Sequence, residues 1–121
     1  MIFKKTNKIK IGRKYELNGA ECKALATNNN GNVVLVREND GHLAFVIGDF
    51  QIKQHNILAT EVMGFSISDT EMRDYLNERC AIAEPIDSTD VAKIIRKRYY
   101  KIPTCLAEVV ASWYMSTYKC W

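Results

Sequence analysis

The chain has 121 residues, of which 47% are hydrophobic and 26% are charged, and this composition matches a globular domain rather than a disordered chain. Its length predicts one domain over residues 1–121, and no apolar stretch approaches the roughly 18 residues of a membrane-spanning helix, so no membrane partner is expected. The formal net charge is +3, yet residues 1–14 and 93–101 together hold eleven basic residues and no acidic one. This polarisation predicts either an anionic partner or basic and acidic faces that satisfy each other within the fold.

Residues 1–66 predict an antiparallel β-meander of about five strands, as a sheet or a small barrel. Side chains there alternate between polar and apolar or are β-branched, as in half-buried strands. The first expected strand covers residues 8–11 and continues through 14–17. The next strands cover 21–27, 33–38 and 42–47, and residues 50–53 and 57–65 form one further strand or two. Asn18-Gly19 is a favoured hairpin turn, because both residue types tolerate positive φ angles.

Residues 67–121 predict a helical part, so the fold class is α+β. Ser68 and Glu71 have the spacing of a capping box, in which each side chain accepts from a backbone N–H at the start of a helix. Pro85 ends this first helix, because proline disfavours helical geometry in the residue before it. We expect the helix to lie on the sheet through its apolar stripe.

Two further helices are predicted after Pro85. Asp87 can cap the second helix, which has apolar side chains on one face and basic side chains on another, and Pro103 ends it. Thr104 can cap the third helix, which is expected to run through Tyr118.

The third helix and the residues after it are dense in aromatic side chains. The apolar stripe of the helix includes Trp113 and Tyr114, and Trp121 adds apolar surface beyond it. This surface either packs against the protein's own sheet or forms a contact between subunits of a homo-oligomer, because aromatic residues favour interface cores. Trp113, Tyr114 and Trp121 are therefore the candidate interface residues.

The sequence contains no recognisable catalytic or metal-binding motif. The cysteines, at positions 22, 80, 105 and 120, form no CxxC pair, and the two histidines, His42 and His55, are isolated. We therefore expect no catalytic residue, no bound metal and no cofactor, and we predict that the protein is not an enzyme. The basic start is followed by no apolar signal segment, which predicts the reducing cytosol, where cysteines mostly act as small buried hydrophobes.

The strongest candidate site is the basic end of the second predicted helix. Cationic and aromatic side chains there share little more than two helical turns. The candidate ligand-binding residues are Lys93, Arg96, Lys97, Arg98, Tyr100 and Lys101. Arginine presents a planar fork to phosphate oxygens, lysine a mobile charge, and tyrosine a face on which a base can stack. The alternative is a solvated basic face that pairs with Glu71, Asp74 and Glu78 on the preceding helix.

Three functions from different classes fit these features. The first is a small non-catalytic protein that binds a nucleotide or signalling nucleotide at the basic helix, with a site that subunits of a homo-oligomer can share. The second is a protein–protein inhibitor anchored by the aromatic C-terminal helix, and the third is a nucleic-acid-binding protein whose affinity falls steeply with salt. A compact domain without a catalytic signature would fit the accessory and inhibitor proteins that phages and mobile elements encode.

Overall fold

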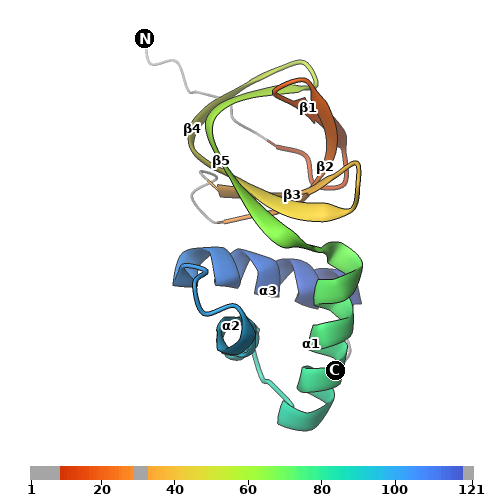
Figure 1. The fold of residues 1–121 in the computed structure, drawn as a ribbon, viewed down its shortest axis with the longest axis vertical. Coiled ribbons are helices and arrows are strands. Elements are labelled where there is room, and N and C mark those ends of the chain that lie inside the picture. Colours follow the sequence, from red (N-terminus) through yellow and green to blue (C-terminus); the bar gives the residue numbers. More distant parts are fainter. Residues whose placement is uncertain (1–8, 29–32, 119–121) are drawn as a thin grey trace.

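A computed structural model of the chain describes residues 9–28 and 33–118. In these ranges it confirms the α+β fold, with five strands followed by three helices (Figure 1). The strands are β1 (Lys14–Leu17), β2 (Ala20–Thr27), β3 (Val33–Glu38), β4 (His42–Lys53) and β5 (Asn56–Ser68). The helices are α1 (Asp69–Ala83), α2 (Ser88–Arg98) and α3 (Thr104–Tyr118). No helix in the described ranges is both long enough and apolar enough to cross a membrane.

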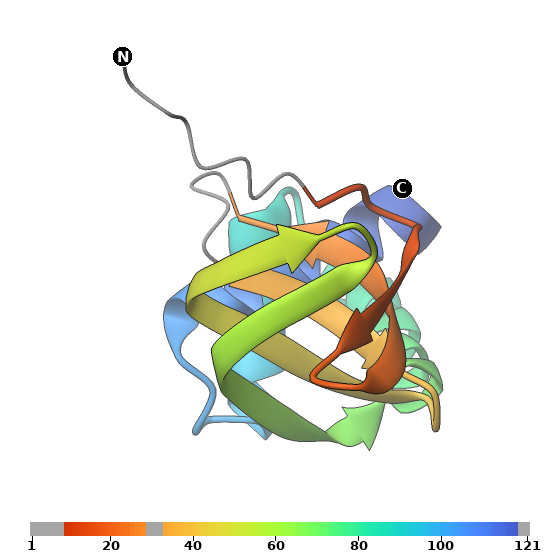
Figure 2. The ribbon, with the colours of Figure 1, turned by 90° about the horizontal axis from the view of Figure 1, so that it is seen from above.

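The strands form a small closed barrel in which each strand pairs with the next one along the chain (Figure 2). These consecutive pairs are all antiparallel, as expected for a meander. The barrel closes through β1 and β5, which pair in parallel and join Glu16 to Asn56 and Leu17 to Ile57. Parallel closure follows from the odd number of strands, because strand direction alternates around the barrel.

The predicted strand over residues 8–11 is wrong for residues 9–11, which are described and form no strand; residue 8 lies outside the described ranges. Gly12 adopts φ +91°, a conformation that favours glycine, and its N–H donates to the carbonyl of Ala24. The chain therefore turns at Gly12 and enters the barrel only at Lys14.

The long pair β4–β5 extends beyond the predicted segments. Residues 50–53 continue β4 across an irregularity between Ile47 and Phe50 instead of forming a strand of their own. Gly48 lies inside this irregularity with φ +82°, and a glycine in such a bulge lets a strand bend. β5 runs to Ser68 because that residue still pairs with His42.

Two hydrophobic cores share the wall of the barrel. One fills the barrel interior, where Val34, Val46 and Phe50 are almost completely buried. The other lies between the outside of the barrel and the helices and includes Leu35. Because successive side chains of a strand point to opposite faces, β3 contributes to both cores, and Val33 to Val36 are all buried. This double burial explains the uninterrupted apolar run in β3.

The helix that lies on the barrel is α3, which contacts β2 and β3 (Figure 1). The expectation that the first helix lies on the sheet is therefore wrong, since α1 continues directly from β5 and points away from the barrel. Its buried side chains, Met72, Leu76 and Cys80, belong to the core between barrel and helices. Arg37 Nη1 lies 2.6 Å from Asp69 Oδ2 and holds the first turn of α1 at the rim of the barrel.

The predicted N-cap residues of the first two helices, Ser68 and Asp87, are confirmed, whereas the Glu71 carboxylate of the predicted capping box lies beside Arg98. The Ser68 hydroxyl accepts from the backbone N–H of Glu71 at 3.1 Å, and the Asp87 carboxylate accepts from that of Asp90 at 3.0 Å. α1 ends at Ala83 and is capped by Glu84, which adopts a left-handed conformation with φ +49°. These caps satisfy backbone groups that have no partner inside the helix.

α3 begins one residue earlier than a cap at Thr104 implies. The carbonyl of Pro103 accepts from the N–H of Ala107, which makes Thr104 the first residue of the helix rather than its cap. The predicted apolar stripe is confirmed as buried, and it comprises Leu106, Val109, Val110, Trp113 and Tyr114. The first alternative, packing within the chain, thus accounts for Trp113 and Tyr114, while Trp121 lies outside the described residues.

Replacing Trp113 by alanine should lower the free energy of unfolding by about 3–5 kcal/mol, because its buried ring leaves a cavity beneath the barrel. Urea denaturation followed by circular dichroism measures this change. Ser112→Ala, on the exposed side of the same helical turn, is the matched control and should change stability by less than about 0.5 kcal/mol. Equal stability of the two variants would contradict the packing of α3 described here.

Candidate functional site

All six side chains of the predicted basic site are exposed. Arg96, Lys97 and Arg98 occupy the last turn of α2, where the negative end of the helix dipole favours cations. Lys93 lies one turn earlier. Tyr100 and Lys101 follow the helix in a turn, and Tyr100 is 71% exposed. The helix dipole therefore accounts for the basic residues of this last turn without any ligand.

Arg96 has a partner within the chain. Its Nε donates to the carbonyl of Ile102 at 3.1 Å, so the side chain bridges the end of α2 to the segment before α3. The side chain of Ile102 is buried in the core between barrel and helices. Arg96 thus helps to fix the connection between α2 and α3.

Arg98 is held between two tyrosines and a carboxylate. The centre of its guanidinium lies 4.9 Å from the ring centroid of Tyr75 and 5.4 Å from that of Tyr99, distances typical of cation–π contacts. Its Nη2 lies 4.0 Å from Oε2 of Glu71, and both side chains are about half exposed. The contacts orient the guanidinium while leaving part of it open to solvent.

The two tyrosines beside Arg98 are themselves fixed. Their rings meet edge to face with centroids 5.8 Å apart, and the Tyr75 hydroxyl donates to the carbonyl of Ile94 at 2.9 Å. Burial raises the pKa of the Tyr99 hydroxyl above its usual value, against the opposing effect of Arg98. The rings next to the basic residues are therefore Tyr75 and Tyr99, whereas the sequence analysis selected Tyr100.

A groove of about 780 Å³ runs between α1 and α2 beside these residues. It brings together Lys97 and Arg98 of the predicted site. Its lining comprises Ser68, Thr70, Glu71, Asp74, Tyr75, Glu78, Arg79, Lys97 and Arg98. Lys93, Arg96, Tyr100 and Lys101 do not line it, so the structure divides the predicted site into a groove-lining part and an outer part.

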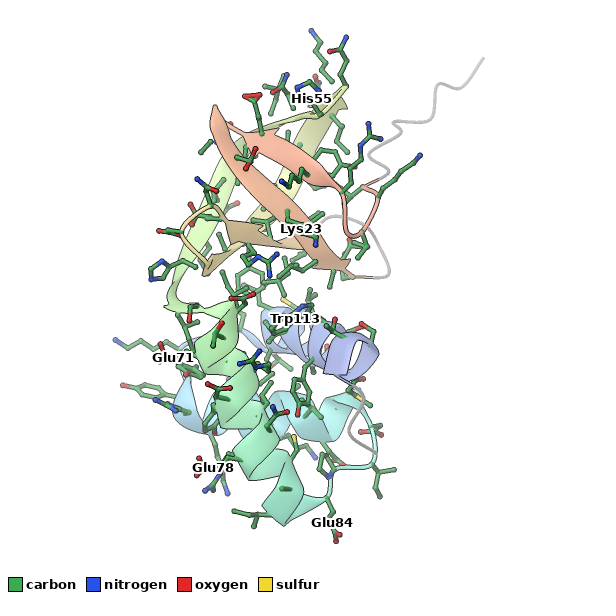
Figure 3. All side chains as sticks on the ribbon, turned by 90° about the vertical axis from the view of Figure 1, so that its right-hand side faces the viewer. Lys23, His55, Glu71, Glu78, Glu84 and Trp113 are labelled. Carbon is green, nitrogen blue, oxygen red and sulfur yellow. The ribbon has the colours of Figure 1, made fainter. Side chains whose placement is uncertain are left out.

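The groove carries both signs of charge in equal number. Three carboxylates come from α1, one cation also comes from α1, and two cations come from α2. Figure 3 shows Glu71 and Glu78 on the same side of α1, one above the other. The sequence analysis raised the alternative that the basic face of α2 pairs with acidic residues of α1. The contact of Arg98 with Glu71 is such a pair.

The α1 side of the groove was missed as a binding surface by the sequence analysis. Tyr75 packs against the core as part of the apolar stripe of α1, and Ser68 caps the helix, so each has a structural role besides lining the groove. The signal that could have found this surface is spacing, since Glu71, Tyr75 and Glu78 recur at four and three residues and so share one helical face.

Both histidines pair with a nearby acid on the surface. His42 Nδ1 lies 3.0 Å from Asp40 Oδ2, and the backbone N–H of His42 donates to the same carboxylate, which lowers the pKa of Asp40. His55 Nε2 lies 3.8 Å from Glu16 Oε2, at the end of the barrel remote from the helices (Figure 3). Within the described residues, no group of histidine, cysteine and acidic side chains could hold a metal ion.

The described cysteines fall into two classes, and Cys120 lies outside the described residues. Cys22 and Cys80 are buried, as expected, while Cys105 is exposed, so the expectation of burial is wrong there because Cys105 lies on the solvent side of the first turn of α3. Burial, with a smaller contribution from Glu38 and Glu21, raises the pKa of the Cys22 thiol to about 11. At neutral pH this thiol is protonated and is a poor nucleophile.

A scan of protein-family models and searches of curated proteins and of solved structures found no match to this chain.

Cys105 should react with a maleimide in the native protein at pH 7, whereas Cys22 and Cys80 should stay unmodified until the protein unfolds. Peptide mapping by mass spectrometry assigns each label. Because the pKa of Cys22 is raised, its protonated form persists as the pH increases, and its labelling should remain slow up to about pH 9. Labelling of Cys22 as fast as that of Cys105 would contradict its burial in the barrel.

Proposed function

We propose that this chain is a small non-catalytic protein that binds a nucleotide in the groove between α1 and α2. The observation that carries the proposal is the joint lining of one groove by Lys97 and Arg98 from α2 and by Tyr75 from α1. A phosphate needs cations, and a base needs a ring face. Both requirements meet within a single groove.

Arg98 is the central residue of this proposal. Its contact with Glu71 is long, at 4.0 Å, and half exposed, and exposed pairs of this kind contribute about 1 kcal/mol or less. A ligand phosphate can therefore take the place of Glu71 as the partner of Arg98 at little cost. Tyr75 and Tyr99 keep the guanidinium in position while this exchange occurs. Lys97 adds a second, mobile charge.

The carboxylates of the groove favour a nucleotide over a simple anion. Glu71, Asp74 and Glu78 repel inorganic phosphate, but they accept hydrogen bonds from the sugar hydroxyls and base amino groups of a nucleotide. Such a ligand has an anionic end for the cations of the groove and several hydrogen-bond donors for its carboxylates. This balance supports a nucleoside phosphate as the ligand class.

Other features support a binding role in the cytosol. Each histidine is paired with a surface carboxylate, and neither pair has the arrangement of a base beside a nucleophile. Cys22, Cys80 and Cys105 are free thiols, and a reducing compartment would keep them so. The inhibitor alternative has less support, because Trp113 and Tyr114, its expected anchors, are buried in the chain's own core.

A nucleic-acid-binding role is the second candidate, and a row of cations on the barrel favours it. Lys14 lies opposite Lys23, and Lys23 lies opposite Arg37, which is itself paired with Asp69, so Lys14 and Lys23 are the cations that this row offers to a ligand. Figure 3 shows Lys23 on the wall of the barrel above the helices. Such a row suits the phosphates of a strand, and its binding would weaken steeply with salt. Lys23→Ala would then reduce binding, whereas Lys97→Ala would not.

Titration calorimetry with a set of nucleoside mono-, di- and triphosphates tests the proposed groove. Lys97→Ala and Arg98→Lys should each weaken nucleotide binding by about tenfold or more, a loss of about 1.4 kcal/mol. Arg98→Lys keeps the charge but removes the planar fork and its stacking on the tyrosines. Inorganic phosphate should bind more weakly than any nucleotide, because it lacks the sugar hydroxyls and base amino groups that can donate to the carboxylates.

The matched control is Lys93→Ala, which removes a cation of α2 that does not line the groove. It should leave nucleotide affinity within about twofold, because a surface charge outside the groove contributes little. An equal loss in Lys93→Ala, or no binding of any nucleotide at millimolar concentration, would overturn the proposal.

A further inference from the structure

The groove between α1 and α2 holds two charged side chains that the proposed phosphate site does not use. Glu78 and Arg79 of α1 both line the groove, and both are exposed. Among the described residues, neither side chain has a hydrogen-bond or ion-pair partner. Glu71 is already paired across the groove, and the Asp74 carboxylate accepts from Nε and Nη2 of Arg73 at 3.2 and 3.1 Å. Glu78 is therefore the lining carboxylate that is available to a ligand.

Spacing along α1 places these two side chains one turn beyond the ring beside which a base would stack. Glu78 and Arg79 follow Tyr75 by three and four residues, and residues at these spacings are neighbours on a helix surface. Glu78 also lies about 10 Å along the helix from Glu71 (Figure 3), because a helix rises about 1.5 Å per residue. The phosphate site at Arg98 and the carboxylate of Glu78 are thus separated by a length that one purine nucleotide can span.

A free carboxylate distinguishes the bases by the donors on their Watson–Crick edges. An ionised carboxylate only accepts hydrogen bonds. Guanine presents two donors side by side, N1–H and the 2-amino group, and these can occupy both carboxylate oxygens. Adenine and cytosine present one amino group beside an acceptor, and uracil presents one N–H between two acceptors. Each of these bases therefore turns a lone pair toward the carboxylate, and guanine does not.

Arg79 adds a preference at a second edge of the base. Its guanidinium is a fork of donors, and the O6 and N7 atoms of guanine are two acceptors that such a fork matches. Adenine has an amino group, a donor, in the place of O6. The two side chains next to Tyr75 therefore favour the same base for independent reasons.

We propose that the groove selects guanine nucleotides and that Glu78 determines this specificity. The inference rests on the proposed nucleotide site and adds the identity of the base. The base stacks beside Tyr75, its N1–H and 2-amino group donate to Glu78, and Arg79 donates to O6 and N7. The phosphates remain with Lys97 and Arg98.

Inosine nucleotides isolate the contact with Glu78, because inosine keeps N1–H, O6 and N7 and lacks only the 2-amino group. Titration calorimetry should show guanosine diphosphate binding about tenfold more tightly than inosine or adenosine diphosphate. Glu78→Gln should reduce the preference for guanosine over inosine to about twofold or less, because an amide offers one acceptor and turns a donor toward the second N–H. The affinity for inosine diphosphate should change by less than about threefold, because the amide oxygen still accepts from N1–H.

Glu108→Gln is the matched control, since it removes the same charge from an exposed position on α3 outside the groove. It should keep the preference for guanosine, and thermal melts followed by circular dichroism confirm that both variants are folded. Guanosine, inosine and adenosine diphosphates that bind within about twofold of one another would refute the selection of guanine and leave the nucleotide site standing. A preference that survives Glu78→Gln would refute the role of Glu78. Failure of every nucleotide to bind would refute the proposed function, and this inference with it.

Discussion

The burial of β3 on both faces is the constraint on which the rest of the fold depends. Val34 and Val36 fill the barrel, while Val33 and Leu35 face the helices. A strand with no polar face needs apolar cover on both sides. The barrel supplies one cover and α3 the other, so the barrel and the helices stabilise each other. Removal of either layer would expose an apolar face of β3 to water.

This constraint also positions the groove. α3 covers β2 and β3, and α1 continues directly from the end of β5. The Arg37–Asp69 ion pair fixes the point of departure, and the carboxylate of Asp69 is largely buried there. α2 then packs beside α1, and Arg98 meets Tyr75 and Glu71. The groove exists because two helices continue past the barrel and face each other.

Local patterns in the sequence predicted the elements of this fold but not their packing. The capping residues Ser68 and Asp87 and the apolar stripe of α3 were predicted correctly, because each depends on residues a few positions apart. The place of α1 was not, because an apolar stripe does not specify which surface covers it. The groove was predicted only in part. Lys97 and Arg98 were found from their charge, but their nearness to Tyr75 depends on helix packing over more than 20 residues.

The groove begins where the longest strand of the barrel ends. Ser68 ends β5, caps α1 and lines the groove. The residue still pairs with His42 of β4, and its hydroxyl accepts from the N–H of Glu71, which also lines the groove. A strand pair on one side and a helix cap on the other therefore fix the first turn of α1. The side chains that α1 contributes to the groove take their positions from the barrel, although α1 itself continues past it.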